Sequence, residues 1–254
     1  IMQLDDAFFE IPCDVVTFDG KVEHTELTDI DRAVAAFFQN VLDSLVVTDT
    51  KRRENSEFSR FVGRDKSRKI YYGNFTDPVS FLSKLTAKLG DKVKANRNEL
   101  VPVCYITRDP VIGFVDGAEY IDIADYGELA NEQGQPYAVI NKSFVALTYR
   151  INALAWNQST LSRLALGLMV WLRHTKGKRK HVFRAKTMLA GAEMEISIEI
   201  RSRKDAMTEP AEVDHENTRL FASSISFEVI AEVYEAESIT VRQGAIGVGG
   251  RVIE

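Results

Sequence analysis

The chain has few of the residue types from which catalytic and metal sites are usually built. It contains four histidines and two cysteines among its 254 residues. No two histidines stand at i, i+4 spacing, and none has a cysteine or a set of carboxylates nearby at metal-ligand spacing. The four histidines are His24, His174, His181 and His215. The sequence therefore predicts no metal, no cofactor and no catalytic residue.

Motifs of phosphate and ester chemistry are also missing. The glycine-rich segment 244–250 lacks the Lys-Ser/Thr pair and the strand-to-helix context of a phosphate-binding loop. No Gly-x-Ser-x-Gly elbow occurs, and the acidic residues after Asp116 do not follow the spacing of a calcium loop. We therefore expect a protein that is not an enzyme and has no small-molecule substrate.

Cysteines and long apolar runs are scarce as well. Cys13 and Cys104 are too few for a disulfide framework, so we expect two reduced cysteines and an intracellular compartment. The longest apolar run, residues 164–172, is far shorter than the about 20 residues that cross a bilayer. Asp5 and Asp6 stand where a signal peptide would be basic. These features predict neither membrane insertion nor export.

The charges are sorted along the chain. No Asp or Glu occurs from residue 159 to 192, and no Lys or Arg occurs from residue 109 to 137. Opposite charges on different segments allow copies of a protein to dock on one another. The candidate interface residues are Lys176, Lys178, Arg179 and Lys180 of a basic turn, and Asp116, Glu119, Asp122, Asp125 and Glu128 of an acidic loop. The net charge of −5 argues against general coating of nucleic acid.

Three amphipathic helices are predicted from apolar residues at spacings of three and four. The first follows an N-cap at Thr28 and runs to about residue 45. The second starts at Asp77-Pro78 and stops at Gly90. The third follows the capping residue Asn157, and its buried stripe consists of Leu161, Leu164, Ala165, Leu168, Met169 and Leu172.

Alternating apolar residues predict five strands. They cover residues 100–107, 139–155, 182–188, 194–203 and 221–234. Residues 1–27 form an extended arm, residues 109–137 are mostly an insertion loop, and the glycine-rich residues 236–254 are a flexible tail.

These elements predict one α+β domain over residues 1–254. Its sheet is mainly antiparallel, amphipathic helices pack on one face, and a long acidic insertion loop is added. Apolar residues recur with a period of 2 along the strands and of 3.6 along the helices, which predicts one shared apolar layer. Its members are Leu147, Tyr149, Ile196, Ile198, Phe227 and Val229 of the sheet, and Phe37, Phe38, Leu164 and Leu168 of the helices.

The basic stretch 51–69 leaves two interpretations open. Basic and aromatic residues alternate in it, which is typical of a nucleic-acid or acidic-partner surface. A solvated loop whose aromatic residues enter the core explains the same pattern. The aromatic residues concerned are Phe58, Phe61, Tyr71 and Tyr72.

The order of these elements resembles the tail-terminator (neck) proteins of long-tailed bacteriophages, especially those with contractile tails. The similar stretches are 100–110 (LVPVCYITRDP), 136–174 (PYAVINKSFVALTYRINALAWNQSTLSRLALGLMVWLRH), 183–203 (FRAKTMLAGAEMEISIEIRSR) and 218–235 (TRLFASSISFEVIAEVYE). The resemblance covers roughly residues 29–235 and lies in the order and apolar character of the elements. No single residue motif carries it.

The resemblance implies a homohexameric ring in the virion tail, made in the cytoplasm of the bacterial host. Such a ring caps the tail tube and sheath, joins them to the head connector and leaves room for DNA in its lumen. Another phage neck, tube or baseplate component fits the same order of elements. A nucleic-acid-binding module that uses residues 51–69 and 176–186 is the alternative from a different class.

Overall fold

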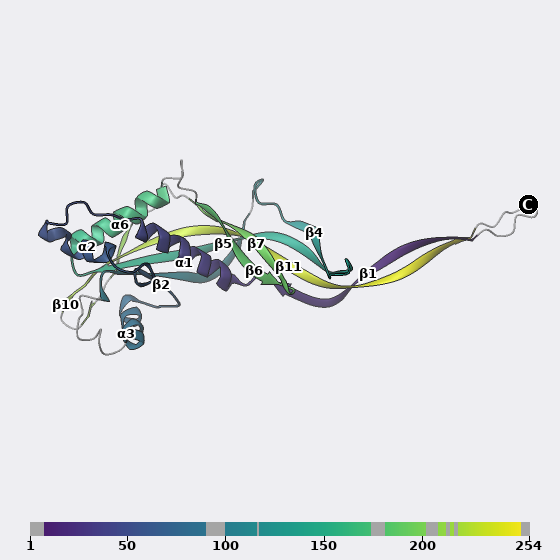
Figure 1. Ribbon diagram of the computed structural model, residues 1–254, viewed down its shortest axis with the longest axis horizontal. Helices are drawn as coiled ribbons and strands as arrows, with labels where there is room; N and C mark the ends of the chain where they lie inside the picture. The colour runs from purple at the N-terminus through teal and green to yellow at the C-terminus, as the bar shows by residue number, and fades with distance from the viewer. Residues whose placement is uncertain are drawn as a thin grey trace, which may run out of the picture.

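The computed structural model describes residues 8–89, 100–115, 117–173, 181–201, 208–211, 214–215 and 218–249. The helical elements are α1 (Leu27–Asp43), η1 (Arg53–Asn55), α2 (Ser56–Val62), η2 (Lys66–Arg68), α3 (Pro78–Leu89) and α6 (Gln158–Arg173). The strands are β1 (Phe8–His24), β2 (Ile70–Tyr72), β3 (Val103–Phe114), β4 (Ile123–Ala130), β5 (Pro136–Ala155), β6 (Val182–Leu189), β7 (Ala192–Ile200), β8 (Glu209–Ala211), β9 (Asp214–His215), β10 (Thr218–Arg219) and β11 (Phe221–Gly249). A helix-covered body lies at one end of the molecule, and a long two-stranded ribbon extends from it (Figure 1).

Strand β11 is the central strand of the main sheet. The strand order is β2-β3-β5-β11-β7-β6, and β1, β4 and β8 join at the ends of the longer strands. One edge of β11 pairs with β5 from Phe221 to Ser238, while its other edge pairs in turn with β8, β7 and β1. Every pairing in this sheet is antiparallel except that of β2 with β3. The predicted α+β class with a mainly antiparallel sheet is confirmed.

The main core lies between this sheet and helices α1, α2 and α6. The ring of Phe38 on α1 lies 4.9 Å from that of Phe227 on β11, and Tyr149 on β5 stacks on Phe227 at 5.8 Å. The strand residues of the predicted apolar layer are all buried, as are Phe38, Leu164 and Leu168. Phe37 is partly buried against them. The spacing of apolar residues in the sequence therefore predicted this core correctly.

Helix α3 differs from the prediction because it covers the opposite face of the sheet. Its Phe81 stacks on Tyr105 of β3 at a ring distance of 4.5 Å. Tyr105 alternates with Cys104, which belongs to the main core, so the two residues point to opposite faces of β3. Helices therefore cover both faces of the sheet at this end of the body.

The helix boundaries follow the sequence with one correction. Helix α1 begins at Leu27 after Glu26, so Thr28 lies inside the helix and is not its N-cap. Its entry is held by Thr25, whose backbone N–H donates to the carbonyl of Tyr234 at 2.9 Å. Helix α6 has its expected start, where the side-chain oxygen of Asn157 accepts from the N–H of Ser159 at 2.8 Å.

The acidic segment 109–137 contains more strand than the predicted loop. Strand β3 continues to Phe114 and pairs with β5 there, and β4 pairs with β5 over Ile123–Ala130. The glycines of this segment favoured a loop in the sequence, but Gly113 and Gly127 lie within strands. Gly117 and Gly134 do adopt positive φ angles in the connections.

The described residues of the two terminal segments pair with each other. Residues 236–249 continue β11, and β1 pairs with them antiparallel from Phe8–Gly249 to His24–Glu235. The register shifts once, between Phe18 and Val22, where Gly20 has a φ of +84°. The two ends of the chain therefore form one ribbon, because the unbroken β11 provides a backbone edge on which β1 pairs.

Candidate interaction surfaces

The structure exposes the four described acidic candidates on one segment. Glu119 and Asp122 lie in the connection between β3 and β4, and Asp125 and Glu128 lie on β4. No described Lys or Arg is paired with any of these carboxylates. We call these four residues the acidic face. Asp116, the fifth candidate, lies outside the described residues.

Large apolar side chains accompany the acidic face. Phe114 is 78% exposed and Ile121 is 62% exposed. Val111, Ile112, Ile123 and Tyr126 are exposed on the same strands and connection. Single exposed apolar residues are common, but a group of this size on two strands that pair with successive parts of β5 is typical of an interaction surface.

The predicted basic turn cannot be placed, because Lys176, Lys178, Arg179 and Lys180 lie outside the described residues. The adjoining cations of the acid-free segment are compensated within the fold. Arg184 pairs with Glu195 at 2.8 Å and Lys186 with Glu193 at 2.5 Å, across β6 and β7. Sorting of charge along the sequence therefore does not produce a basic patch on β6.

The stretch 51–69 resolves into short helices, and its two phenylalanines enter the core. Phe58 and Phe61 of α2 are buried, so neither offers a ring on which a base could stack. Arg64 donates to the carbonyl of Leu100, and Lys69 is buried against Asp43 at 2.7 Å. Several cations of this stretch therefore have structural partners.

Four cations of the same stretch are exposed, and their side chains form no ion pair or hydrogen bond among the described residues. Arg68 is one of them, and the other three, Lys51, Arg53 and Arg60, lie on η1, on α2 and in the turn before them. We call these three the basic end, because η1 and α2 lie at the end of the body away from the ribbon (Figure 1). The sequence did not distinguish these three residues from their paired neighbours.

The ribbon of β1 and β11 extends away from the rest of the sheet (Figure 1). Beyond Ser238 the backbone of β11 pairs with β1 alone, up to Gly249. Among the described residues, no strand pairs with the outer edge of either ribbon strand over Phe8–Phe18. The eleven paired positions from Phe8 to Phe18 span about 37 Å at ~3.4 Å per residue.

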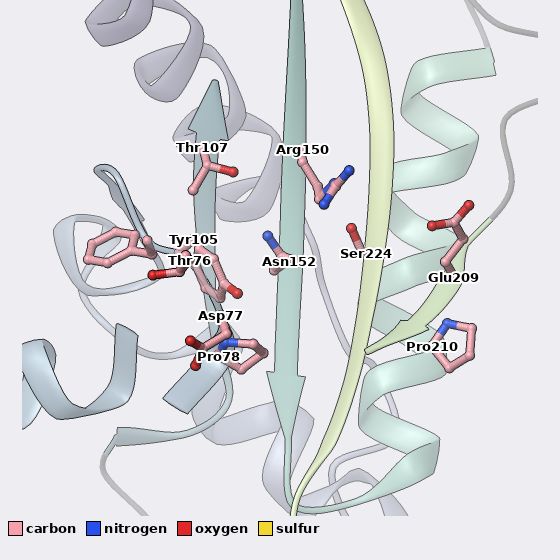
Figure 2. Close-up of a pocket in the computed structure, with 11 residues that line it drawn as sticks. Thr76, Asp77, Pro78, Tyr105, Thr107, Arg150, Asn152, Glu209, Pro210 and Ser224 are labelled. Atoms are coloured by element: carbon pink, nitrogen blue, oxygen red, sulfur yellow. The ribbon is translucent and has the colours of Figure 1, made fainter. Parts of the chain in front are cut away.

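An open cavity of about 270 Å³ lies on the face of the sheet that α3 covers (Figure 2). Strands β3, β5 and β11 form its floor, and α3 and β8 border it. Ser224 places a buried hydroxyl there that has no partner in the described part of the chain. The lining residues are Phe75, Thr76, Asp77, Pro78, Tyr105, Thr107, Arg150, Asn152, Glu209, Pro210 and Ser224. They include no histidine or cysteine, so they provide no nucleophile–base pair of the common kinds.

A buried carboxylate joins four elements of the body. Asp31 on α1 accepts hydrogen bonds from Tyr149 at 2.5 Å, from Arg108 Nε at 2.9 Å and from Tyr72. Burial, the hydrogen bond to Asp31 and the charge of Asp31 together raise the pKa of Tyr72 to about 12. The same causes raise the pKa of Tyr149. This cluster was missed by the sequence analysis, because its members are far apart in the chain. It ties α1 to the sheet.

The described residues contain few other candidate features. No three His, Cys, Asp or Glu side chains there gather closely enough to hold a metal ion. Cys104 is a free thiol in the core, and burial raises its pKa to about 12. No helix in the described ranges has the length and apolar content needed to cross a membrane.

Comparison with known proteins does not assign the chain to a family. No protein-family model matches it, and a search of curated proteins finds no significant relative.

Proposed function

We propose that this protein is a non-enzymatic structural subunit of a bacteriophage tail, of the tail-terminator kind. Copies assemble into a ring that caps the tail tube and sheath and joins them to the head connector. The subunits act by contact, so no catalytic residue is needed.

The observation that carries this proposal is the ribbon of β1 and β11. An isolated pair of strands is marginally stable in water, because it has no layer against which to bury its apolar residues. The paired segments 8–18 and 239–249 are rich in aromatic and β-branched residues, and only Arg242 is basic. Unpaired strand edges of this kind associate with other chains.

The order of elements supports the same proposal. A strand, an acidic insertion, a long strand, an amphipathic helix and three final strands follow one another in the order that resembles tail terminators. The exposed apolar residues beside the acidic face form another surface, which the described residues leave uncovered. A subunit in a ring contacts a neighbour on each side, so such surfaces support the proposal.

The native mass of the full-length protein tests the proposal. We expect a mass close to six times the chain mass of 28.6 kDa, measured by native mass spectrometry and by light scattering. A second variant lacks residues 1–18 and 239–254, which removes the ribbon and leaves every core strand of the body. Its far-UV circular dichroism should retain the body, while its mass should fall to that of smaller species.

Two results would contradict the proposal. One is a full-length protein that stays monomeric at every concentration tested and shows no binding to tail or head-connector proteins. The other is a ribbon-free variant that forms the same ring as the full-length protein.

A further inference from the structure

The basic end and the acidic face are matched in chemistry and opposite in charge. The basic end has the unpaired cations Lys51, Arg53 and Arg60. Exposed apolar residues accompany them, because Val46 is 76% exposed and Leu166 is 64% exposed. Val46 and Leu166 lie near each other, because their chain neighbours Leu45 and Gly167 are in contact, and α6 also contacts η1.

The acidic face repeats this composition with the opposite sign. Its four carboxylates have no cationic partner among the described residues, and Phe114 and Ile121 stand exposed beside them. Some exposed charges elsewhere on the body are paired, as Arg184 is with Glu195. Exposed charges that are mainly of one sign therefore accompany exposed apolar residues at both places, although Glu54 of η1 is also exposed among the cations of the basic end.

We infer that the acidic face of one copy of this chain docks on the basic end of a second copy. Opposite potentials steer the two surfaces together and fix their register, while the apolar residues supply the buried area. The inference rests on the proposed function, because it names the surfaces through which the subunits of the assembly meet.

The placement of the two surfaces sets the kind of assembly. The elements of the basic end, η1 and α2, lie at the far end of the body, and β4 lies towards the ribbon (Figure 1). The surfaces are thus separate, and a copy cannot satisfy one with the other. A contact between two different surfaces is heterologous, and it continues from copy to copy until the rotation closes a ring.

Charge reversal with rescue tests the inference. One variant carries Lys51→Glu, Arg53→Glu and Arg60→Glu, and a second carries Glu119→Lys, Asp122→Lys and Glu128→Lys. Each alone should associate with itself more than about tenfold more weakly than the wild type, because like charges then face each other. A 1:1 mixture of the two should assemble again, since every contact in an alternating ring joins opposite charges. One chain that carries all six substitutions should also assemble.

A matched control changes the net charge by the same amount elsewhere. Arg32→Glu, Lys84→Glu and Lys88→Glu alter exposed cations on α1 and α3. This variant should assemble like the wild type. Melting temperature and circular dichroism verify that every variant is folded.

The outcomes separate the inference from the proposed function. Loss in each triple variant with recovery in the mixture supports the inference. If both triple variants assemble as the wild type does, at 50 mM and at 500 mM salt, the inference is overturned. The proposed function then still stands. Loss without recovery in both the mixture and the sixfold variant also overturns it. A wild-type protein that never assembles contradicts both.

Discussion

The body and the ribbon are built from the same strand, yet they are stabilised in different ways. In the body, β11 has strands on both edges and helices on its faces, and Phe227 and Val229 are completely buried. In the ribbon, β11 has β1 on one edge and no other strand among the described residues. Burial of apolar area stabilises the body. The ribbon depends mainly on backbone hydrogen bonds, whose net contribution is small.

This difference separates folding from assembly along one continuous strand. The described residues of the body include buried cores against which its helices and strands pack. The ribbon is a pair of strands, and a two-stranded pair is marginally stable when isolated. Substitutions in the body should therefore change the stability of the subunit, whereas changes in the ribbon should act on association.

The largest expected effect distinguishes the core from the base of the ribbon. Phe227→Ala removes a buried ring that contacts Phe38 and Tyr149, and it should lower the free energy of unfolding by about 3–5 kcal/mol. The matched change at the ribbon, Val22→Ala, affects a side chain that is 44% exposed and should cost less than about 1 kcal/mol. Urea denaturation at one fixed protein concentration measures both. Equal losses would remove the distinction between the two regions.

A smaller effect should come from the buried Asp31 cluster. Asp31→Asn replaces a charged acceptor of three hydrogen bonds and should cost about 1.5–3 kcal/mol. The control Glu195→Gln breaks an exposed ion pair with Arg184 and should cost at most about 1 kcal/mol. Comparison of the free energies of unfolding of the two variants tests this prediction. A larger loss in the control would mean that the cluster does not hold α1 to the sheet.

The smallest effect should appear at alkaline pH. Burial, with a further contribution from Asp77, raises the pKa of Tyr105 to about 12, above the about 10 of an unfolded tyrosine. The folded state therefore favours the protonated phenol, and this contribution is complete below pH about 10 and is lost as the pH rises towards 12. Between pH 9 and 11.5, Tyr105→Phe should lose less stability than the wild type. Identical losses in urea denaturation would exclude a role for Tyr105.

Local patterns predicted the body well, because its elements bury one side. The buried stripe of α6 and the alternating residues of β5 and β7 lie where their periods placed them. The ribbon could not be predicted in this way. Its register joins Phe8 to Gly249, and a glycine-rich sequence gives no local indication of a partner so far away in the chain.

The candidate surfaces were predicted in part. Exposure of Glu119 and Asp122 agrees with their acidic, glycine-containing surroundings. The strand structure of β4 was not predicted, because pairing with β5 overrides the low strand preference of its acids and glycine. The basic end was not recognised either. Which cations of residues 51–69 find internal partners, such as Asp43 for Lys69, depends on the fold.

Hydrogen exchange of the backbone amides tests the contrast between body and ribbon most directly. It should be followed in the assembled protein and in subunits dissociated by the charge-reversal variants. In dissociated subunits, we expect fast exchange over residues 8–18 and 239–249 and slow exchange over β5 and the first half of β11. Assembly should slow exchange in the ribbon and at the acidic face and basic end, and leave β5 and the first half of β11 nearly unchanged. A ribbon that is as protected as the body in dissociated subunits, or that gains no protection on assembly, would contradict this account.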